Sequence, residues 1–309
     1  MLSGGLAAPL FACDLCSVYH ASLAHGVVEQ GFHVGFSEQF TRYATLQFES
    51  RRVPNEAHQF LDSSVTQLAV GYHFNDRFGA QLTVPLVYRS FRRAEGGGID
   101  QGTESGLGDI ALSASYMAFR RDTERWSLAW SVLGGVKFPT GDTHRLREEL
   151  EEEVPTPGEI ESAVHGHDLT LGSGSYDGFV GTQVFTRWNR VFFTAEVQYA
   201  IRSEGDFGYR FANDLSWSGG PGYYLAFHEQ FTLGVQAAVS GESKGRDFFQ
   251  GDRAEDTALT AVYLGPKFGL SWKERFSAEF GAFFPVDIQN SALQSVPDYR
   301  ITGALIWRF

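Results

Sequence analysis

Polar and apolar side chains alternate with a period of two along about twelve separate stretches of this sequence. In the last stretch, residues 298–309, one face carries Ile301 and Leu305 while the other carries Arg300 and Thr302. Neighbouring side chains of a β-strand point to opposite faces of its sheet, so the pattern predicts strands whose two faces meet different surroundings. Each stretch is long enough to cross a bilayer as a tilted strand, which takes about ten residues.

The joins between these expected strands alternate strictly between short and long. The strands are 31–46, 65–74, 78–90, 109–120, 127–138, 176–188, 191–202, 214–227, 231–242, 257–272, 276–287 and 298–309. The long joins are 47–63, 91–107, 139–175, 203–212, 243–256 and 288–297. Transmembrane barrels alternate in this way, with tight periplasmic turns at one end and longer external loops at the other. A soluble β-sandwich, the competing interpretation, needs shorter strands with turn signals every 8–12 residues or so.

We therefore predict an all-β fold, a transmembrane antiparallel β-barrel of about twelve strands in the bacterial outer membrane. An even strand number puts both termini on the periplasmic side. Aromatic residues flank the short joins and predict a girdle at that membrane interface. They are Phe74, Phe119, Trp126, Trp188, Phe227, Phe231, Trp272 and Phe276.

Composition agrees with this prediction and excludes other classes. Aromatic residues make up 15% of the chain, beside 35 Gly, which favours strands and turns over helices. No run of about 18 apolar residues occurs, so no transmembrane helix is expected. The net charge of −12 argues against nucleic acid as a partner.

The N-terminus differs from the rest of the chain. Residues 1–12 are apolar and rich in small residues, like the end of a secretory signal, but lack its basic start. The stretch from Leu10 to Cys13 also resembles a lipoprotein box, which leaves lipidation of Cys13 as an alternative. We expect residues 13–30 to form a periplasmic segment and residues 31–309 to form the barrel.

Charged side chains in the polar rows are the candidate selectivity residues, because charges in a barrel wall are tolerated only on its inner face. Both signs occur, so pairs should cross-link the wall. The predicted set is Arg89, Lys137, Glu196, Arg202, Glu242, Lys267, Glu279 and Arg300. Twelve strands lie between filled eight-stranded barrels and the wide porins of 16 to 18 or so, which favours a narrow or partly plugged lumen.

The segment before the first strand contains Cys13 and Cys16, followed by His20. A local disulfide is the favoured reading in an oxidising compartment. A metal site built from Cys13, Cys16 and His20 is the alternative, with copper(I) or zinc as suitable ions. Haem attachment is disfavoured because Ser17 stands where the motif needs histidine.

The longest join contains His165, His167 and Asp168, a third metal-like pattern that we interpret as a solvated loop. Its charged run 145–154 predicts one short external helix with a solvated face. No nucleophile elbow or phosphate-binding loop occurs, so we expect no enzyme and no cofactor. A rim hydrolase using Ser173 or Ser175 near His167 and Asp177 is the enzymatic alternative.

Three segments in order resemble a known family. They are 106–110 (GLGDI), 137–142 (KFPTGD) and 171–177 (LGSGSYD), and together they resemble the outer-membrane transporters of the phenol meta-pathway family. The resemblance spans residues 30–309. It implies a barrel fold and passive uptake of small compounds, aromatic ones among them. The same Gly, Pro and Asp residues are also explained as architecture of the barrel rim.

The predicted function is passive transport of a small solute through a narrow, charged lumen. Outer-membrane lipid and the solute are the expected partners. The aromatic carboxy-terminal residue, Phe309, resembles the terminal signal of outer-membrane barrels and implies recognition by their assembly machinery. The alternative is an outer-membrane barrel that binds metal or docks a partner through the Cys13–Cys16 segment.

Overall fold

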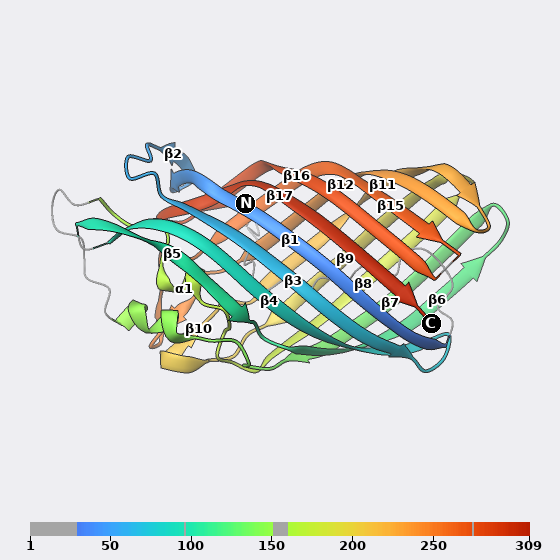
Figure 1. Ribbon diagram of the computed structural model, residues 1–309, viewed down its shortest axis with the longest axis horizontal. Coiled ribbons are helices and arrows are strands. Elements are labelled where there is room, and N and C mark those ends of the chain that lie inside the picture. Colours follow the sequence, from blue (N-terminus) through green and yellow to red (C-terminus); the bar gives the residue numbers. More distant parts are fainter. Residues whose placement is uncertain (1–29, 96, 151–159, 274) are drawn as a thin grey trace, which may run out of the picture.

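The computed structural model describes residues 30–95, 97–150, 160–273 and 275–309. Within these residues, twelve long strands form one closed antiparallel barrel, which confirms the predicted fold (Figure 1). The barrel strands are β1 (Gly31–Phe48), β3 (Phe60–His73), β4 (Phe78–Glu95), β6 (Ala111–Asp122), β7 (Trp126–Lys137), β8 (Asp177–Trp188), β9 (Val191–Ile201), β11 (Asp214–His228), β12 (Phe231–Lys244), β15 (Leu259–Trp272), β16 (Phe276–Asn290) and β17 (Leu293–Arg308). Each pairs with its neighbours in chain order, and β17 pairs with β1 to close the ring.

The two faces of the wall differ as the alternation predicts. Along the closing pair, Phe36 lies opposite Leu305, with exposed fractions of 44% and 46%. Gln39 lies opposite Thr302 on the inner face, and these are only 9% and 7% exposed. Large apolar side chains therefore cover the outside, where the bilayer provides no hydrogen-bond partners, and polar side chains line the lumen.

Five short turns lie at one end of the barrel, together with the C-terminus (Figure 1). They join β3 to β4, β6 to β7, β8 to β9, β11 to β12 and β15 to β16, as predicted. Phe74, Trp188 and Trp272 flank these turns and expose 55%, 66% and 56% of their surface. This end thus carries the outward aromatic side chains that the sequence places beside the short joins.

The opposite end carries the long links and their small elements. These are β2 (Arg51–Val53), β5 (Gly98–Leu107), η3 (Asp206–Gly208), β10 (Tyr209–Arg210), β13 (Phe248–Phe249) and β14 (Asp252–Arg253). β5 folds back on β4 as a hairpin, so the predicted loop 91–107 is largely strand. Most residues of β5 are exposed, so it lacks the inside–outside alternation of the barrel strands.

The expected long link 288–297 is wrong. β16 runs to Asn290 and β17 begins at Leu293, which leaves a two-residue turn. The Asn290 side chain donates to the carbonyl oxygens of Gln47 and Ala292, both at 3.1 Å, and Ala292 adopts a left-handed φ of 49°. Side-chain hydrogen bonds stabilise this turn, so no glycine marks it in the sequence.

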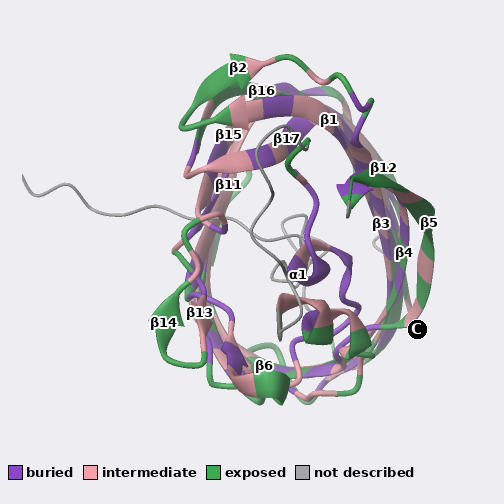
Figure 2. Ribbon diagram, turned by 90° about the vertical axis from the view of Figure 1, so that its left-hand side faces the viewer, coloured by how far each residue is buried: buried purple, intermediate pink, exposed green. Residues whose placement is uncertain are grey.

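The link between β7 and β8 folds into the barrel. We call residues 139–176 the plug segment; residues 151–159 lie outside the described part of it. It contains the 3₁₀ helix η2 (His144–Leu150) and the short helix α1 (Gly166–Leu169). Viewed from the long-loop end, α1 lies within the ring of strands (Figure 2). The charged run does begin in a short helix, η2, whose His144 and Arg147 are exposed, whereas His165 and His167 are buried, so the predicted solvated loop is wrong.

Apolar packing holds the plug segment in place. Val164 and Leu169 are 1% and 0% exposed and contact Tyr43, Leu61 and Phe91 on the inner face of the wall. Burial of two branched side chains stabilises the inward position by roughly 3–6 kcal/mol before entropy is counted. The prediction for this loop rested on its charged residues, whereas burial of its apolar residues places the loop inside the barrel.

Among the described residues, no helix is long and apolar enough to pass through a membrane.

A charge placed on the outer face should destabilise the barrel. Leu264 lies mid-strand in β15 and is 47% exposed on that face. We expect Leu264→Arg to lower the free energy of unfolding by about 2–4 kcal/mol, because arginine at mid-bilayer depth loses its hydration. Urea titration in lipid vesicles measures this loss. Leu264→Phe keeps the site apolar and serves as the control; equal stability of both variants would contradict a lipid-facing position.

Candidate functional site

The eight predicted selectivity residues all lie on the inner rows of the wall. Arg89, Lys137, Arg202 and Arg300 are no more than 7% exposed, and so buried within the barrel. The other four also point inward, and every one of the eight belongs to the long barrel strands except Arg202, which follows β9. The structure divides them into three groups along the barrel, described below.

The central group surrounds a cavity of about 130 Å³. Nine of the twelve strands contribute to its lining, so this cavity is the middle of the lumen. Glu196, Lys267, Glu242 and Arg300 supply its charges. Leu133 and Phe283, from β7 and β16 on opposite sides of the ring, supply apolar surface.

Ion pairs fix the charged side chains of this cavity. Lys267 Nζ lies 2.8 Å from Glu279 Oε2, and Ser218 donates to Glu196 Oε1 at 2.6 Å. Lys267 therefore balances two carboxylates, one bound directly and one across the same cavity. The cavity has fixed charges of both signs beside apolar surface.

A second set of side-chain contacts links β17 to β12 along the inner face of the wall. Arg300 donates to Glu242 at 2.6 Å, and its guanidinium lies 4.4 Å from the centre of the Tyr263 ring. The Tyr263 hydroxyl donates to the same Glu242 oxygen at 2.6 Å. Glu242 is thus held by two donors, which fixes the cavity wall toward the long-loop end.

Two smaller cavities continue the lumen in both directions. One of about 60 Å³ shares Gln183, Glu196, Ser218 and Lys267 with the central cavity and reaches Arg120 near the short turns. The other, also about 60 Å³, lies beneath the plug segment and is lined by Arg89, Lys244 and plug residues. These three cavities are small, and the plug segment lines the one toward the long-loop end.

Polar contacts add to the apolar anchor of the plug segment. Gln59 is 1% exposed; its amide donates to the Glu161 carbonyl at 3.0 Å, and its oxygen accepts from the Ala163 N–H at 3.0 Å. The backbone N–H of Ser295 donates to the Ala163 carbonyl at 2.9 Å. Gln59 directly precedes β3 and Ser295 belongs to β17. Two parts of the wall that are far apart in sequence therefore hold one short stretch of the plug segment.

Charge inside the plug is also paired. His167 Nδ1 lies 3.0 Å from Glu149 Oε1. Burial favours neutral histidine, but Asp168 and Glu149 outweigh it and hold the pKa of His167 well above its ordinary value. Burial likewise opposes ionised Glu149, but His167 lowers its pKa to about 2. The pair is consequently ionic in the folded protein.

Lys137 and Arg202 belong to a buried cluster at the base of the plug. Lys137 Nζ lies 2.8 Å from Asp109 and 2.9 Å from Asp177, while Arg202 lies 2.8 Å from Asp177 and 2.7 Å from Asp214. Burial raises the pKa of Asp109, but Lys137 and the N–H groups of the plug outweigh this and lower it overall. The cluster links three strands to the plug and fits the rim architecture predicted for Asp109 and Asp177.

The structure does not support the hydrolase alternative, because in the described residues no histidine contacts Ser173 or Ser175. Ser173 Oγ lies 2.8 Å from Asp109 and 2.9 Å from Lys137 Nζ, and Ser175 donates to Asp177 at 2.8 Å. His167 instead contacts Glu149, Asp168 and the Tyr209 ring. Both serines are 2% exposed and serve the cluster described above.

Sequence reasoning missed the apolar part of the lumen. Leu133 shares the inward parity of Lys137, and Phe283 that of Glu279, so alternation alone could have found both. The inward plug carried no comparable signal. The candidate metal residues Cys13, Cys16 and His20, and the signal-like residues 1–12, lie outside the described residues, and these predictions stay predictions.

Comparison with known proteins supports the barrel. The family model described as "Putative MetA-pathway of phenol degradation" matches residues 53–149, which confirms the family resemblance over that part of the chain. None of the curated proteins compared with the chain matches it.

A solved structure shows the same fold. An outer membrane channel from Pseudomonas putida F1 aligns with a TM-score of 0.61 and 12% identity, covering 94% of this chain and 100% of that one. The beta domain of the Bordetella autotransporter BrkA aligns less well, with a TM-score of 0.47, 12% identity and coverage of 91% and 100%. The closed barrel with its apolar outer surface is a bacterial outer-membrane fold, and lipid surrounds it.

Removal of one cation from the buried cluster should destabilise the fold. We expect Arg202→Met to cost about 3–5 kcal/mol, since it leaves Asp214 and part of Asp177 uncompensated in a buried site. Urea unfolding in detergent micelles measures the change. Arg246 pairs with Glu255 at the surface and is 41% exposed, so Arg246→Met should cost no more than about 1 kcal/mol. Equal losses would show that the cluster contributes no more than a surface pair.

Proposed function

We propose that this outer-membrane barrel is a passive channel for a small solute that combines an apolar or aromatic part with polar groups. The central cavity carries this proposal. It lies in the middle of a closed barrel and offers apolar surface from Leu133 and Phe283 beside fixed charges. No enzymatic activity is inferred, and the solved structures described above are a channel and an autotransporter barrel domain.

The cavity volume sets the size of the solute. At about 130 Å³ it is close to the engineered apolar cavities of about 150 Å³ that hold benzene. A single-ring compound is therefore of a size that this cavity holds. The aromatic preference implied by the family resemblance is compatible with this volume and with the Phe283 ring.

Fixed charges would select among such solutes. Lys267 lies between Glu196 and Glu279, and Arg300 is bound to Glu242. Field strength is high in a narrow, poorly hydrated lumen, so each charge acts strongly on a passing ion. Arg89, Lys137 and Arg202 would act on the plug and the rim, and the other five on the solute.

The lengths of the turns and links assign the two ends of the barrel to the two sides of the membrane. We infer that the short turns and both termini face the periplasm and the plug segment faces outside, as in barrels with tight periplasmic turns. Phe309 is 75% exposed, and its N–H donates to the Phe32 carbonyl at 2.9 Å, so the terminal aromatic ring is free for recognition by the assembly machinery.

The direct test is swelling of liposomes that contain the purified protein, with single-ring solutes that are neutral, cationic or anionic. Size-dependent swelling above that of protein-free liposomes is expected. The proposal fails if no solute enters faster, even through the loosened variant described next.

Loosening the plug segment should increase flux. Leu169→Ala removes a fully buried anchor at a cost of about 2–5 kcal/mol. If the anchored plug limits passage, swelling should become faster by about tenfold or more, since 1.4 kcal/mol or so shifts an equilibrium tenfold. Ile160→Ala alters an exposed residue of the same segment and should leave the rate unchanged. Equal rates for both variants would show that the plug does not limit passage.

A change of lumen charge should change ion preference. Lys267→Gln leaves Glu196 and Glu279 uncompensated in the central cavity, so the ratio of cation to anion flux should rise several-fold. Reversal potentials across planar bilayers under a salt gradient report this ratio. Arg246→Gln removes the same charge from the exposed long-loop end and is the control. A shift of equal size in the control would refute a selective role for Lys267.

A further inference from the structure

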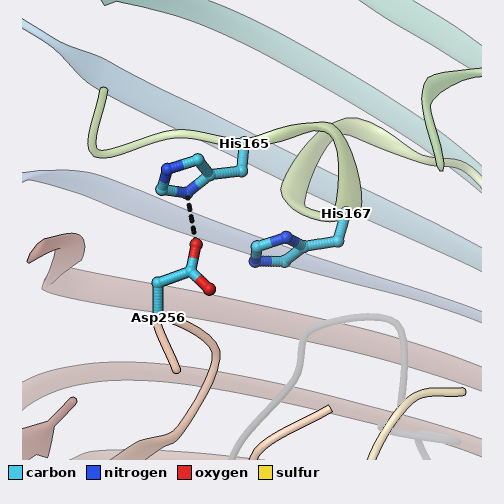
Figure 3. Close-up of side chains that lie close together, drawn as sticks. All are labelled: His165, His167 and Asp256. Carbon is cyan, nitrogen blue, oxygen red and sulfur yellow. Dashed lines mark ion pairs between the residues drawn. The ribbon is translucent and has the colours of Figure 1, made fainter. Parts of the chain in front are cut away.

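Two histidines and an aspartate meet where the plug segment touches the link between β14 and β15. His165 and His167 come from the two sides of Gly166 at the start of α1, and Asp256 comes from the opposing link. Figure 3 shows the three side chains turned toward one another. The polar atoms that they offer lie within 4.8 Å of one another.

We propose that His165, His167 and Asp256 bind a divalent transition-metal ion of the zinc type, which ties the plug segment to the barrel wall. Two imidazoles and a carboxylate are ligands that Zn²⁺ and its neighbours accept. The ion would join parts of the chain separated by about ninety residues. The site is distinct from the Cys13–Cys16 segment, which the sequence offered as a metal site.

The donor distances suit such an ion after small movements. His165 Nδ1 lies 3.4 Å from Asp256 Oδ2, and the two imidazole rings stack at 5.5 Å between centres and 12° between planes. Ligand atoms around tetrahedral zinc lie roughly 3.3 Å apart, as follows from bonds of about 2.0–2.1 Å. One pair therefore already has the spacing required, and the donor atom of His167 lies within 4.8 Å of both.

A neighbouring carboxylate orients His167. Glu149 Oε1 lies 3.0 Å from His167 Nδ1 and also accepts the His167 backbone N–H at 2.7 Å. A metal ion would displace the Nε2 proton that the charged His167 carries in the metal-free protein, while Nδ1 keeps its proton toward Glu149; metal-binding histidines commonly donate their second N–H to a carboxylate. The Tyr209 ring stacks on the other side of His167 at 6.1 Å and limits its rotation.

Space and further ligands are available beside the three donors. The cavity of about 60 Å³ beneath the plug is lined by His167, Asp168 and Asp256, and it is large enough for an ion with a water molecule. The Asp168 carboxylate lies 3.5 Å from His167 Nε2 and can serve as a fourth ligand. Lys244 also borders this cavity, but it is paired with Asp247, which reduces its repulsion of a cation.

The structural alternative is a set of ion pairs that needs no metal. Charged histidines beside Glu149, Asp168 and Asp256 would hold the plug to the wall by charge alone. The two readings differ in one observable property. Only the metal site predicts stoichiometric binding that depends on Asp256.

The test is Zn²⁺ binding by the full chain in detergent micelles, measured by competition with a chromophoric chelator. The background variant Cys13→Ser/Cys16→Ser removes the sulfur ligands. It should bind one Zn²⁺ per chain, and Asp256→Asn in that background should weaken binding by more than about tenfold. Asp252→Asn removes an exposed carboxylate from the adjacent strand β14 and should leave affinity unchanged.

His165→Asn provides a second loss of ligand on the other side of the site and should weaken binding as Asp256→Asn does. The inference is overturned if the background variant binds no Zn²⁺, or if Asp256→Asn and His165→Asn bind as tightly as Asp252→Asn. Heat-dependent migration of the folded barrel on gels identifies any variant that fails to fold. If Asp256→Asn or His165→Asn fails to fold, the affinity of the other variant for Zn²⁺ tests the inference.

A consequence for transport rests on the proposed channel function. Zn²⁺ should slow liposome swelling in the background variant, a chelator should restore it, and Asp256→Asn should be insensitive. If Zn²⁺ binds but no variant transports any solute, the channel proposal fails and the metal site stands. If solutes pass but Zn²⁺ does not bind, the metal site fails and the channel stands.

Discussion

Closure of the hydrogen-bonded ladder is the constraint on which the rest of this structure depends. A bilayer offers no partner to a free N–H or carbonyl group, so the first and last strands must pair. Here β1 and β17 do so from His33 and Arg308 up to Phe48 and Leu293. Once the ring is closed, every second side chain faces the lumen, and an interior must be made from polar and charged residues.

That interior is stabilised by compensation of charge. Four of the five predicted lumen cations, Lys137, Arg202, Lys267 and Arg300, each contact a carboxylate within 3 Å. Such pairs hold side chains across strands and keep the lumen narrow. The same arrangement serves two purposes, since the charges that stabilise the wall also determine which solute can pass between Leu133 and Phe283.

Alternation and join lengths predicted the closed barrel, its strand number and the inward position of all eight lumen residues. These features depend on parity, which a sequence displays directly. The tight turn at Ser291 and Ala292 was missed because side-chain hydrogen bonds from Asn290, and no glycine, stabilise it. The inward plug was missed because its position depends on Val164 and Leu169 finding Tyr43, Leu61 and Phe91, contacts between residues distant in the chain. The proximity of Asp256 to His165 and His167 also depends on contacts between distant residues, so no local sequence pattern predicts it.

The anchors of the plug also imply an order of events during assembly. Gln59 and Ser295 both bind the stretch around Ala163, and they come from opposite ends of the barrel sequence. Ser295 pairs with Leu46 of β1, so it is in position only when the first and last strands have met, and contacts between distant residues form late because loop closure must come first. The plug segment therefore gains its full set of wall contacts only after β1 and β17 have paired. Before that step, the long-loop end of the barrel is less obstructed than in the folded protein.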